Sequence, residues 1–209
     1  MTQDVSLGSS ASDLVAHIIM AHTDIISANF LRYPPMPTFT EVKRKEPLTT
    51  QEELDRRLRH GGKKTSDFAL DRAEVTSENL VRLLADLPPE AALALSSKVN
   101  LVGEQTLHIP LVDFQCTKTV ENLSYLTLAM RRLDTAGGFI LASENSYHFY
   151  GRSLLSQSNW LKFSAMCLLL EPLVDIRYIG HCLLDGFSAL RISMHRLSQR
   201  EVPTVVAIL

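Results

Sequence analysis

Three apolar segments of the chain end in side chains that could bind a metal ion or a phosphate group. The run from Ile109 to Val112 leads into Asp113, and Gln115 follows two residues later. Further along the chain come Ser146-Tyr147-His148 and Val174-Asp175. An acid, a Ser-x-His pair and a second acid, each beside an apolar segment, predict one site assembled from separate strands.

Asp113 is the acid with the clearest setting, because it directly follows an apolar strand. A carboxylate there is costly unless it meets a metal, a cation or water. Asp113 is therefore interpreted either as a divalent-metal ligand or as an acid at a strand end that faces water. Gln115 lies on the same strand face. Its neutral oxygen is a weaker ligand than a carboxylate, so a second metal ion is not expected.

Ser146 and His148 also share one strand face, since they are two residues apart. A hydroxyl beside an imidazole can bind phosphate oxygens. A Ser/His nucleophile pair is disfavoured, because this spacing does not give the required geometry and no nucleophile elbow is present. A half-buried histidine at a sheet edge is the remaining alternative.

Arg191 is the charged residue of the apolar stretch Ala189 to Ser193, and the basic residue His195 follows. An arginine in this position could neutralise a triphosphate or a nucleic-acid backbone. It could equally form an ion pair with Asp175 or Asp185.

The composition limits the class of protein. The chain has 209 residues, of which 45% are hydrophobic, and its formal net charge is −2. These values indicate a folded core and no overall basic field. Contacts with DNA or RNA would therefore require a local patch, and the most basic stretch is Lys43 to Lys64.

Cellular location is inferred from three features of the sequence. The N-terminus lacks the basic and apolar regions of a signal peptide. The longest apolar run, Ala165 to Leu170, is too short to cross a bilayer. Cys116, Cys167 and Cys182 are widely spaced and are expected to be free thiols. A cytoplasmic protein without a membrane partner is predicted.

Apolar spacing and helix-start residues predict the order of the elements. Helices are expected at 14–32, from about 50, from 76 and at 120–133 and 159–170; 39–45 is either a short strand or a loop. Strands are expected at 107–116, 139–142, 147–150, 174–175, 189–193 and 204–208. Residues 91–95 are expected to add a helical turn.

This order predicts an α+β fold, with a mixed or antiparallel sheet flanked by helices. The β-α-β-β-α-β order of the second half favours a ferredoxin-like (split βαβ) core. We therefore expect a mostly helical N-terminal region, residues 1–104, packed on an α+β core, residues 105–209.

The ordered fragments resemble the archaeo-eukaryotic primases and primase-polymerases. That superfamily carries an apolar-Asp-x-Asp/Glu strand, a Ser-x-His motif, an apolar-Asp motif and an arginine strand followed by a basic residue. The matching segments here, all within residues 105–209, are Val112-Asp113-Phe114-Gln115, Ser146-Tyr147-His148, Val174-Asp175 and Leu190-Arg191-Ile192-Ser193-Met194-His195. With Gln115 in place of the second acid, the chain is similar to the one-aspartate (primase 1D-like) group.

The resemblance implies a metal-dependent nucleotidyltransferase. Asp113 and Asp175 would be the catalytic residues and the ligands of Mg²⁺ or Mn²⁺, with Gln115 as a weak ligand. Ser146, His148, Arg191 and His195 would contact the nucleoside triphosphate. Because one acid is missing, template-dependent nucleotidyl transfer would be weakened or lost.

An alternative is a non-catalytic nucleic-acid- or protein-binding module on the same scaffold, in a prokaryotic complex. In that case Lys43 to Lys64 and Arg191 would form the surface for DNA or RNA.

Overall fold

A computed structural model describes residues 4–33, 66–88, 91–133, 136–194 and 201–209 of the chain. These residues form five α-helices, a short 3-10 helix and two antiparallel sheets. The elements in order are α1 (Ala11–Ala21), β1 (Ile25–Tyr33), β2 (Ser66–Asp71), the 3-10 helix η1 (Arg72–Glu74), α4 (Ser77–Ala85), β3 (Ala92–Leu101), β4 (Thr106–His108), β5 (Leu111–Asp113), α5 (Val120–Arg132), β6 (Gly138–Ala142), β7 (Tyr147–Gly151), α6 (Gln157–Leu168), α7 (Ile176–Asp185), β8 (Ala189–Arg191) and β9 (Thr204–Ile208). The predicted α+β class is confirmed.

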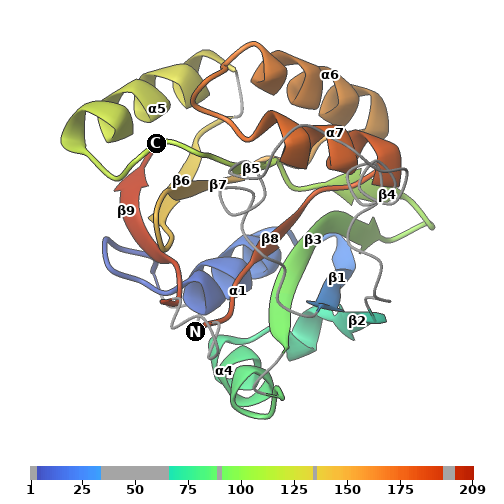
Figure 1. Cartoon of the computed structure of the whole chain (residues 1–209). Coiled ribbons are helices and arrows are strands. Elements are labelled where there is room, and N and C mark those ends of the chain that lie inside the picture. Colours follow the sequence, from blue (N-terminus) through green and yellow to red (C-terminus); the bar gives the residue numbers. More distant parts are fainter. Residues whose placement is uncertain (1–3, 34–65, 89–90, 134–135, 195–200) are drawn as a thin grey trace, which may run out of the picture.

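The two sheets have different strand orders. The first sheet runs β2-β1-β3-β4, and β8 pairs with the part of β3 that β4 leaves open. The second sheet runs β5-β7-β6-β9. Helices α5, α6 and α7 lie together on one side of the second sheet, whereas α1 lies near the centre of the molecule (Figure 1). The ferredoxin-like arrangement within this fold stays a prediction.

Helix α1 supplies the centre of the larger buried cluster. Its Leu14, Val15 and Ile18 are buried together with Phe30 of the first sheet and Tyr150 of the second. A second cluster joins the opposite face of the second sheet to α5, α6 and α7. Strand β7 divides its side chains between the two, because successive residues of a strand point to opposite faces. His148 and Tyr150 therefore share the face turned towards the first sheet.

The N-terminal residues are fastened to β9 by backbone hydrogen bonds. Gly8 N donates to Val205 O at 2.8 Å, Val205 N donates to Ser9 O at 2.9 Å, and Ala11 N donates to Pro203 O at 2.8 Å. Helix α1 then starts at a capping box, in which Ser10 and Asp13 each bond to the other's backbone N–H. Segments from the two ends of the chain thus lie side by side.

Several predicted elements are confirmed with small shifts of their ends. Thr76 caps α4, and the predicted helices at 120–133 and 159–170 correspond to α5 and α6. The predicted hairpin is β6 and β7, and the predicted C-terminal strand is β9. The predicted strand at 107–116 is divided into β4 and β5 by Ile109-Pro110, since proline has no N–H for a ladder bond.

Other predictions were wrong. The helix expected at 14–32 ends at Ala21, and Ile25–Tyr33 is instead β1, which pairs with both β2 and β3. Residues 91–95 open β3 rather than a helical turn. The described part of the N-terminal half is therefore not mostly helical. Residues 25–33 form a strand despite their helical spacing, because they pair with both β2 and β3 and because their β-branched and aromatic side chains suit a half-buried sheet.

The segment that follows Val174 was also misassigned. Val174 makes an isolated bridge with Phe114, but Asp175 is the N-cap of α7, a helix that the sequence did not predict. The helix ends at Gly186, whose φ of 73° is in the left-handed region that glycine adopts most easily. This turn leads directly into β8.

The remaining predictions stay untested. Residues 39–45, the basic stretch Lys43 to Lys64 and His195 lie outside the described residues. The division of the chain between residues 104 and 105 stays a prediction. No helix in the described part of the chain combines the length and apolar character that crossing a membrane requires.

Candidate functional site

Asp113 and His148 occupy directly opposite positions on β5 and β7. Their side chains share one sheet face, as expected for an antiparallel pair. Asp113 Oδ1 lies 3.5 Å from His148 Nε2, and the side chains are 34% and 8% exposed. The fold therefore brings one acid and one imidazole together where a solute could reach the acid.

His148 is buried in an environment that keeps it neutral. Burial, and secondly the Arg191 guanidinium, lower the pKa of His148 to about 3. Its Nδ1 has no hydrogen-bond partner among the described residues. Such an atom destabilises the fold by about 1–3 kcal/mol unless a ligand or water satisfies it.

Ser146 lies just before β7 rather than within it. Its buried Oγ also lacks a partner of standard geometry in the described chain. It is nevertheless close enough to the Cys116 thiol to favour the thiolate, although burial dominates and raises the pKa of Cys116. Both members of the Ser-x-His motif therefore retain hydrogen-bonding capacity.

Arg191 is the cation of this region and is only 9% exposed. It pairs with Ala94 of β3. Its NH1 donates to the carbonyl oxygens of Ser193 and Glu201, and the Tyr150 hydroxyl donates to Arg191 O at 3.5 Å. Because carbonyl contacts hold the guanidinium, Arg191 is a fixed positive charge rather than a flexible surface side chain.

Asp175 lies beside Asp113 in the backbone, since Asp175 N donates to Asp113 O at 3.1 Å. Its carboxylate accepts hydrogen bonds from Arg177 N at 2.9 Å and Tyr178 N at 3.1 Å. Both bonds end on Oδ1, so the other oxygen is the one that could face a cation. Asp175 is thus both a helix cap and a candidate ligand.

Gln115 is exposed and belongs to the same neighbourhood. Its backbone N–H donates to Leu173 O at 2.9 Å, and its Nε2 donates to Pro172 O at 3.3 Å. The side-chain amide therefore bonds the segment after β5 to the loop before α7. A carboxylate here could not make that bond, because it has no hydrogen to donate.

One comparison with known proteins decides the family. A family model described as AEP-like, archaeo-eukaryotic primase 1D-like, matches residues 71–204. The chain belongs to this family. The match begins well before residue 105, so it also includes α4 and β3. No curated protein and no solved structure matches the chain significantly.

Members of this primase superfamily generally use divalent metals. No group of three or more His, Cys, Asp or Glu side chains in the described ranges is placed to hold a metal ion. A backbone hydrogen bond of 3.1 Å joins Asp175 to Asp113, so the chain places two acidic residues side by side. Mg²⁺ commonly binds one or two carboxylates and completes its shell with phosphates and water, so this donor set fits one such ion and does not fit two.

Two tyrosines complete the surroundings of the primase-like site and were missed from the sequence. Tyr150 follows His148 by two residues, so strand alternation could have revealed it. Burial raises the pKa of both Tyr150 and Tyr178. Tyr178 donates its hydroxyl to Ala189 O at 3.1 Å. It lies on α7, a helix that was not predicted from the sequence.

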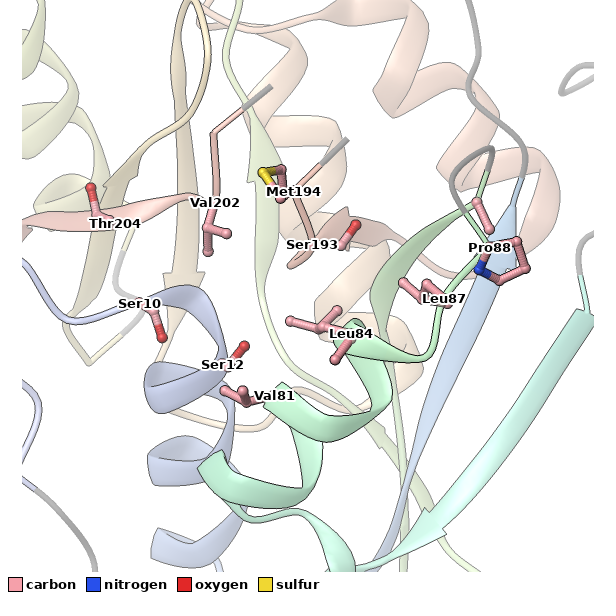
Figure 2. Close-up of a pocket in the computed structure, with 12 residues that line it drawn as sticks. Ser10, Ser12, Val81, Leu84, Leu87, Pro88, Ser193, Met194, Val202 and Thr204 are labelled. Atoms are coloured by element: carbon pink, nitrogen blue, oxygen red, sulfur yellow. The ribbon is translucent and has the colours of Figure 1, made fainter. Parts of the chain in front are cut away.

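A separate groove of about 340 Å³ lies between the starts of α1 and β9, helix α4 and the end of β8. Figure 2 shows Ser12, Leu84 and Val202 around it, with Ser193 and Met194 at its border. Asp113, His148 and Arg191 do not line this groove.

Proposed function

We propose that this primase-like protein binds a nucleoside triphosphate together with one divalent cation, and that its nucleotidyl-transfer activity is weakened or lost. The observation that carries the proposal is the grouping of Asp113 and His148 at paired strand positions, with the buried cation Arg191 close enough to depress the histidine pKa. Negative phosphates would be attracted to such a site.

Each side chain has a role that its setting supports. Arg191, held by backbone carbonyls, would attract the phosphates without a large loss of side-chain entropy. His148, neutral at physiological pH, would carry its proton on Nε2, the ring nitrogen on the side of Asp113, and donate it to a phosphate oxygen. Ser146 offers a hydroxyl donor in the same motif.

Asp113 and Asp175 would hold the Mg²⁺ or Mn²⁺ ion. When bound, the ion would offset phosphate charge. Within the described ranges no third acid, histidine or cysteine joins Asp113 and Asp175 in a group that could hold a metal ion, and Gln115 is neutral and bonded to Pro172. One oxygen of Asp175 is also committed to α7. These bonds support weak transfer activity, or binding without transfer.

Isothermal titration calorimetry tests the binding. Ribo- and deoxyribonucleoside triphosphates would be titrated with Mg²⁺ or Mn²⁺ into the wild-type protein and Asp113→Ala. We expect binding to the wild type and at least tenfold weaker binding to the variant, whereas Asp67→Ala, on exposed β2, should leave it unchanged. Failure of the wild-type protein to bind any nucleotide with either ion would overturn the proposal.

Activity is measured separately, by primer synthesis and primer extension on single-stranded templates. We expect little or no product, and any product should be lost with Asp113→Ala. Efficient metal-dependent synthesis would contradict the weakened activity while retaining the nucleotide site.

The alternative is a non-catalytic nucleic-acid- or protein-binding module, which the local use of Asp175 and Gln115 also favours. Salt-dependent DNA or RNA binding that survives the double variant Asp113→Ala/Asp175→Ala would favour this module. Charge-reversal of Lys43 to Lys64 would then be expected to remove that binding.

A further inference from the structure

A buried polar network lies against the strand that carries Arg191. Ser97, His108 and Ser188 are 0%, 1% and 3% exposed. Ser97 Oγ lies 3.0 Å from His108 Nδ1, and His108 Nε2 lies 2.7 Å from Gln157 Oε1. The His108 ring also stacks on Trp160, with the ring centroids 4.8 Å apart. No role for His108 was predicted from the sequence.

The hydrogen-bond directions follow from the donors present. Gln157 Oε1 can only accept, so His108 carries its proton on Nε2 and donates it to that oxygen. Nδ1 of the neutral ring is then an acceptor for the Ser97 hydroxyl, whose oxygen accepts from Ser188 N at 3.0 Å. Burial lowers the pKa of His108, which agrees with a neutral ring. Both ring nitrogens are satisfied.

The network fastens the start of β8. Ser97 N also donates to Ser188 O at 2.7 Å, and Trp160 Nε1 donates to Ser188 Oγ at 3.4 Å. Strand β8 begins at the next residue and reaches Arg191 three residues after Ser188. A three-residue strand has few ladder bonds of its own, so its position depends on how its ends are held.

The end of β8 is held in a different way. Ile192 N donates to Leu93 O at 2.9 Å, and Leu93 N donates to Ser193 Oγ at 3.0 Å. Arg191 therefore lies between two anchors on β3. The bonds at the end are made by Ile192 and Ser193, which directly follow β8. Those at the start depend on His108, Gln157 and Trp160 from β4 and α6.

We propose that His108 is a positioning residue for Arg191 and acts through Ser97 and Ser188. The imidazole is an acceptor for the Ser97 hydroxyl and, by fixing that hydroxyl, sets the start of β8. This inference rests on the proposed function in one respect, because nucleotide affinity is used to detect a change in the position of Arg191.

The first test compares nucleotide affinity by calorimetry in His108→Leu and Ser97→Ala. Each removes the bond between the two side chains, and Ser97→Ala is the milder change if His108→Leu folds poorly. We expect about tenfold weaker binding. His108→Gln, which can accept and donate at its terminal amide, should restore most of the loss.

A matched control separates positioning from general destabilisation. Val99→Ala truncates a buried side chain of β3, the strand that carries Ser97, and Val99 lies outside the network. Its affinity is compared with that of the network variants after urea denaturation has measured the stability of each. Affinity losses no larger than those of Val99→Ala, or no rescue by His108→Gln, would overturn the proposal.

Nuclear magnetic resonance without nucleotide makes the test independent of the proposed function. We expect Ser97→Ala to shift the Arg191 Nε–H resonance and to reduce hydrogen-exchange protection at Ser188. If the wild-type protein binds no nucleotide, the proposed function fails and these signals alone decide: unchanged Arg191 and Ser188 signals overturn the positioning role.

Discussion

His148 and His108 are both buried, yet the regions around them are built differently. His108 has a partner for each ring nitrogen, namely Ser97 and Gln157. His148 has Asp113 at 3.5 Å from one nitrogen and no partner among the described residues for the other. Both regions border β8, which carries Arg191.

This difference distinguishes a structural framework around His108 from a candidate binding site around His148. A buried polar group is tolerated when it is bonded and destabilises the fold when it is not. The His108 region is complete within the chain, as a structural network should be. The His148 region keeps unused hydrogen-bonding capacity beside a fixed cation, as expected where a phosphate ligand binds.

The largest effect should come from removing the cation of the site. Arg191→Met deletes the charge but retains most of the side-chain volume, and we expect about 100-fold weaker nucleotide binding, because charge-assisted bonds contribute about 1.5–3 kcal/mol. Calorimetry measures it. Arg152→Met, which changes an exposed arginine over Phe139, is the control; equal affinities for all three proteins would remove Arg191 from the site.

Leucine substitutions test the comparison of the two histidines directly. His108→Leu leaves Ser97 and Gln157 without their bonds, so the free energy of unfolding should fall by about 2–3 kcal/mol. His148→Leu removes an unsatisfied nitrogen, so stability should change by less than about 1 kcal/mol, while nucleotide binding weakens, though less than in Arg191→Met. Urea denaturation provides both values. A larger stability loss for His148→Leu would reverse the assignment of framework and site.

The pH dependence of stability should also carry the signature of His108. Burial lowers its pKa in the folded state, so below about pH 6.5 the unfolded chain binds a proton that the folded chain does not. Stability is therefore lost as pH falls from about 6.5 towards the folded-state pKa, by at most about 1.4 kcal/mol per pH unit for this group.

That contribution is isolated by comparing the wild type with His108→Gln. Lys98 lies near enough to lower the His108 pKa further, whereas the bond to Gln157 acts against the shift. Urea titrations between pH 7 and 5 should show a shallower slope for the variant. Parallel slopes would mean that His108 titrates equally in both states.

Asp175 should separate helix capping from metal binding. Asp175→Ala removes the cap of α7 and should destabilise the protein by about 1 kcal/mol. Asp175→Asn retains a capping oxygen, so its stability should stay near that of the wild type while Mn²⁺-dependent nucleotide affinity falls. If both variants bind nucleotide and Mn²⁺ like the wild type, Asp175 is a cap alone.

The smallest effect is expected at Gln115. Gln115→Glu adds a carboxylate but removes the bond to Pro172 O, so we expect Mn²⁺ affinity to rise only a few-fold. Calorimetry with Mn²⁺ alone provides the measurement, and Gln115→Ala is the control for losing the amide bond. Weaker Mn²⁺ binding by Gln115→Glu than by Gln115→Ala would place Gln115 away from the ion.

Sequence patterns were most informative where local chemistry and tertiary structure agree. Thr76 and the apolar spacing of α5 located helices, and the β6–β7 hairpin followed from the glycines at the start of β6 and the aromatic residues of β7. One site containing Asp113 and His148 was predicted from short motifs beside apolar segments, and the order of those motifs indicated the primase-like family. Each of these motifs is local in the chain.

Features that depend on contacts between distant parts of the chain were not predicted from the sequence. Nothing local distinguishes Ile25–Tyr33 from a continued helix, since its strand form depends on β2 and β3. Helix α7 was hidden because Val174-Asp175 reads as a strand, although Asp175 is a typical N-cap residue. The bonds among Ser97, His108 and Ser188 join residues up to 91 positions apart, a separation at which spacing carries no information.

The bonds between residues 8–11 and the beginning of β9 bear on how the chain can be trimmed. Strand β9 is the last strand of its sheet, and Gly8, Ser9 and Ala11 occupy backbone groups of Pro203 and Val205 at its outer side. Deleting the first eleven residues would bare those groups and invite strand addition by another molecule. Affinity tags are therefore best attached so that residues 8–11 and their bonds to Pro203 and Val205 are left intact.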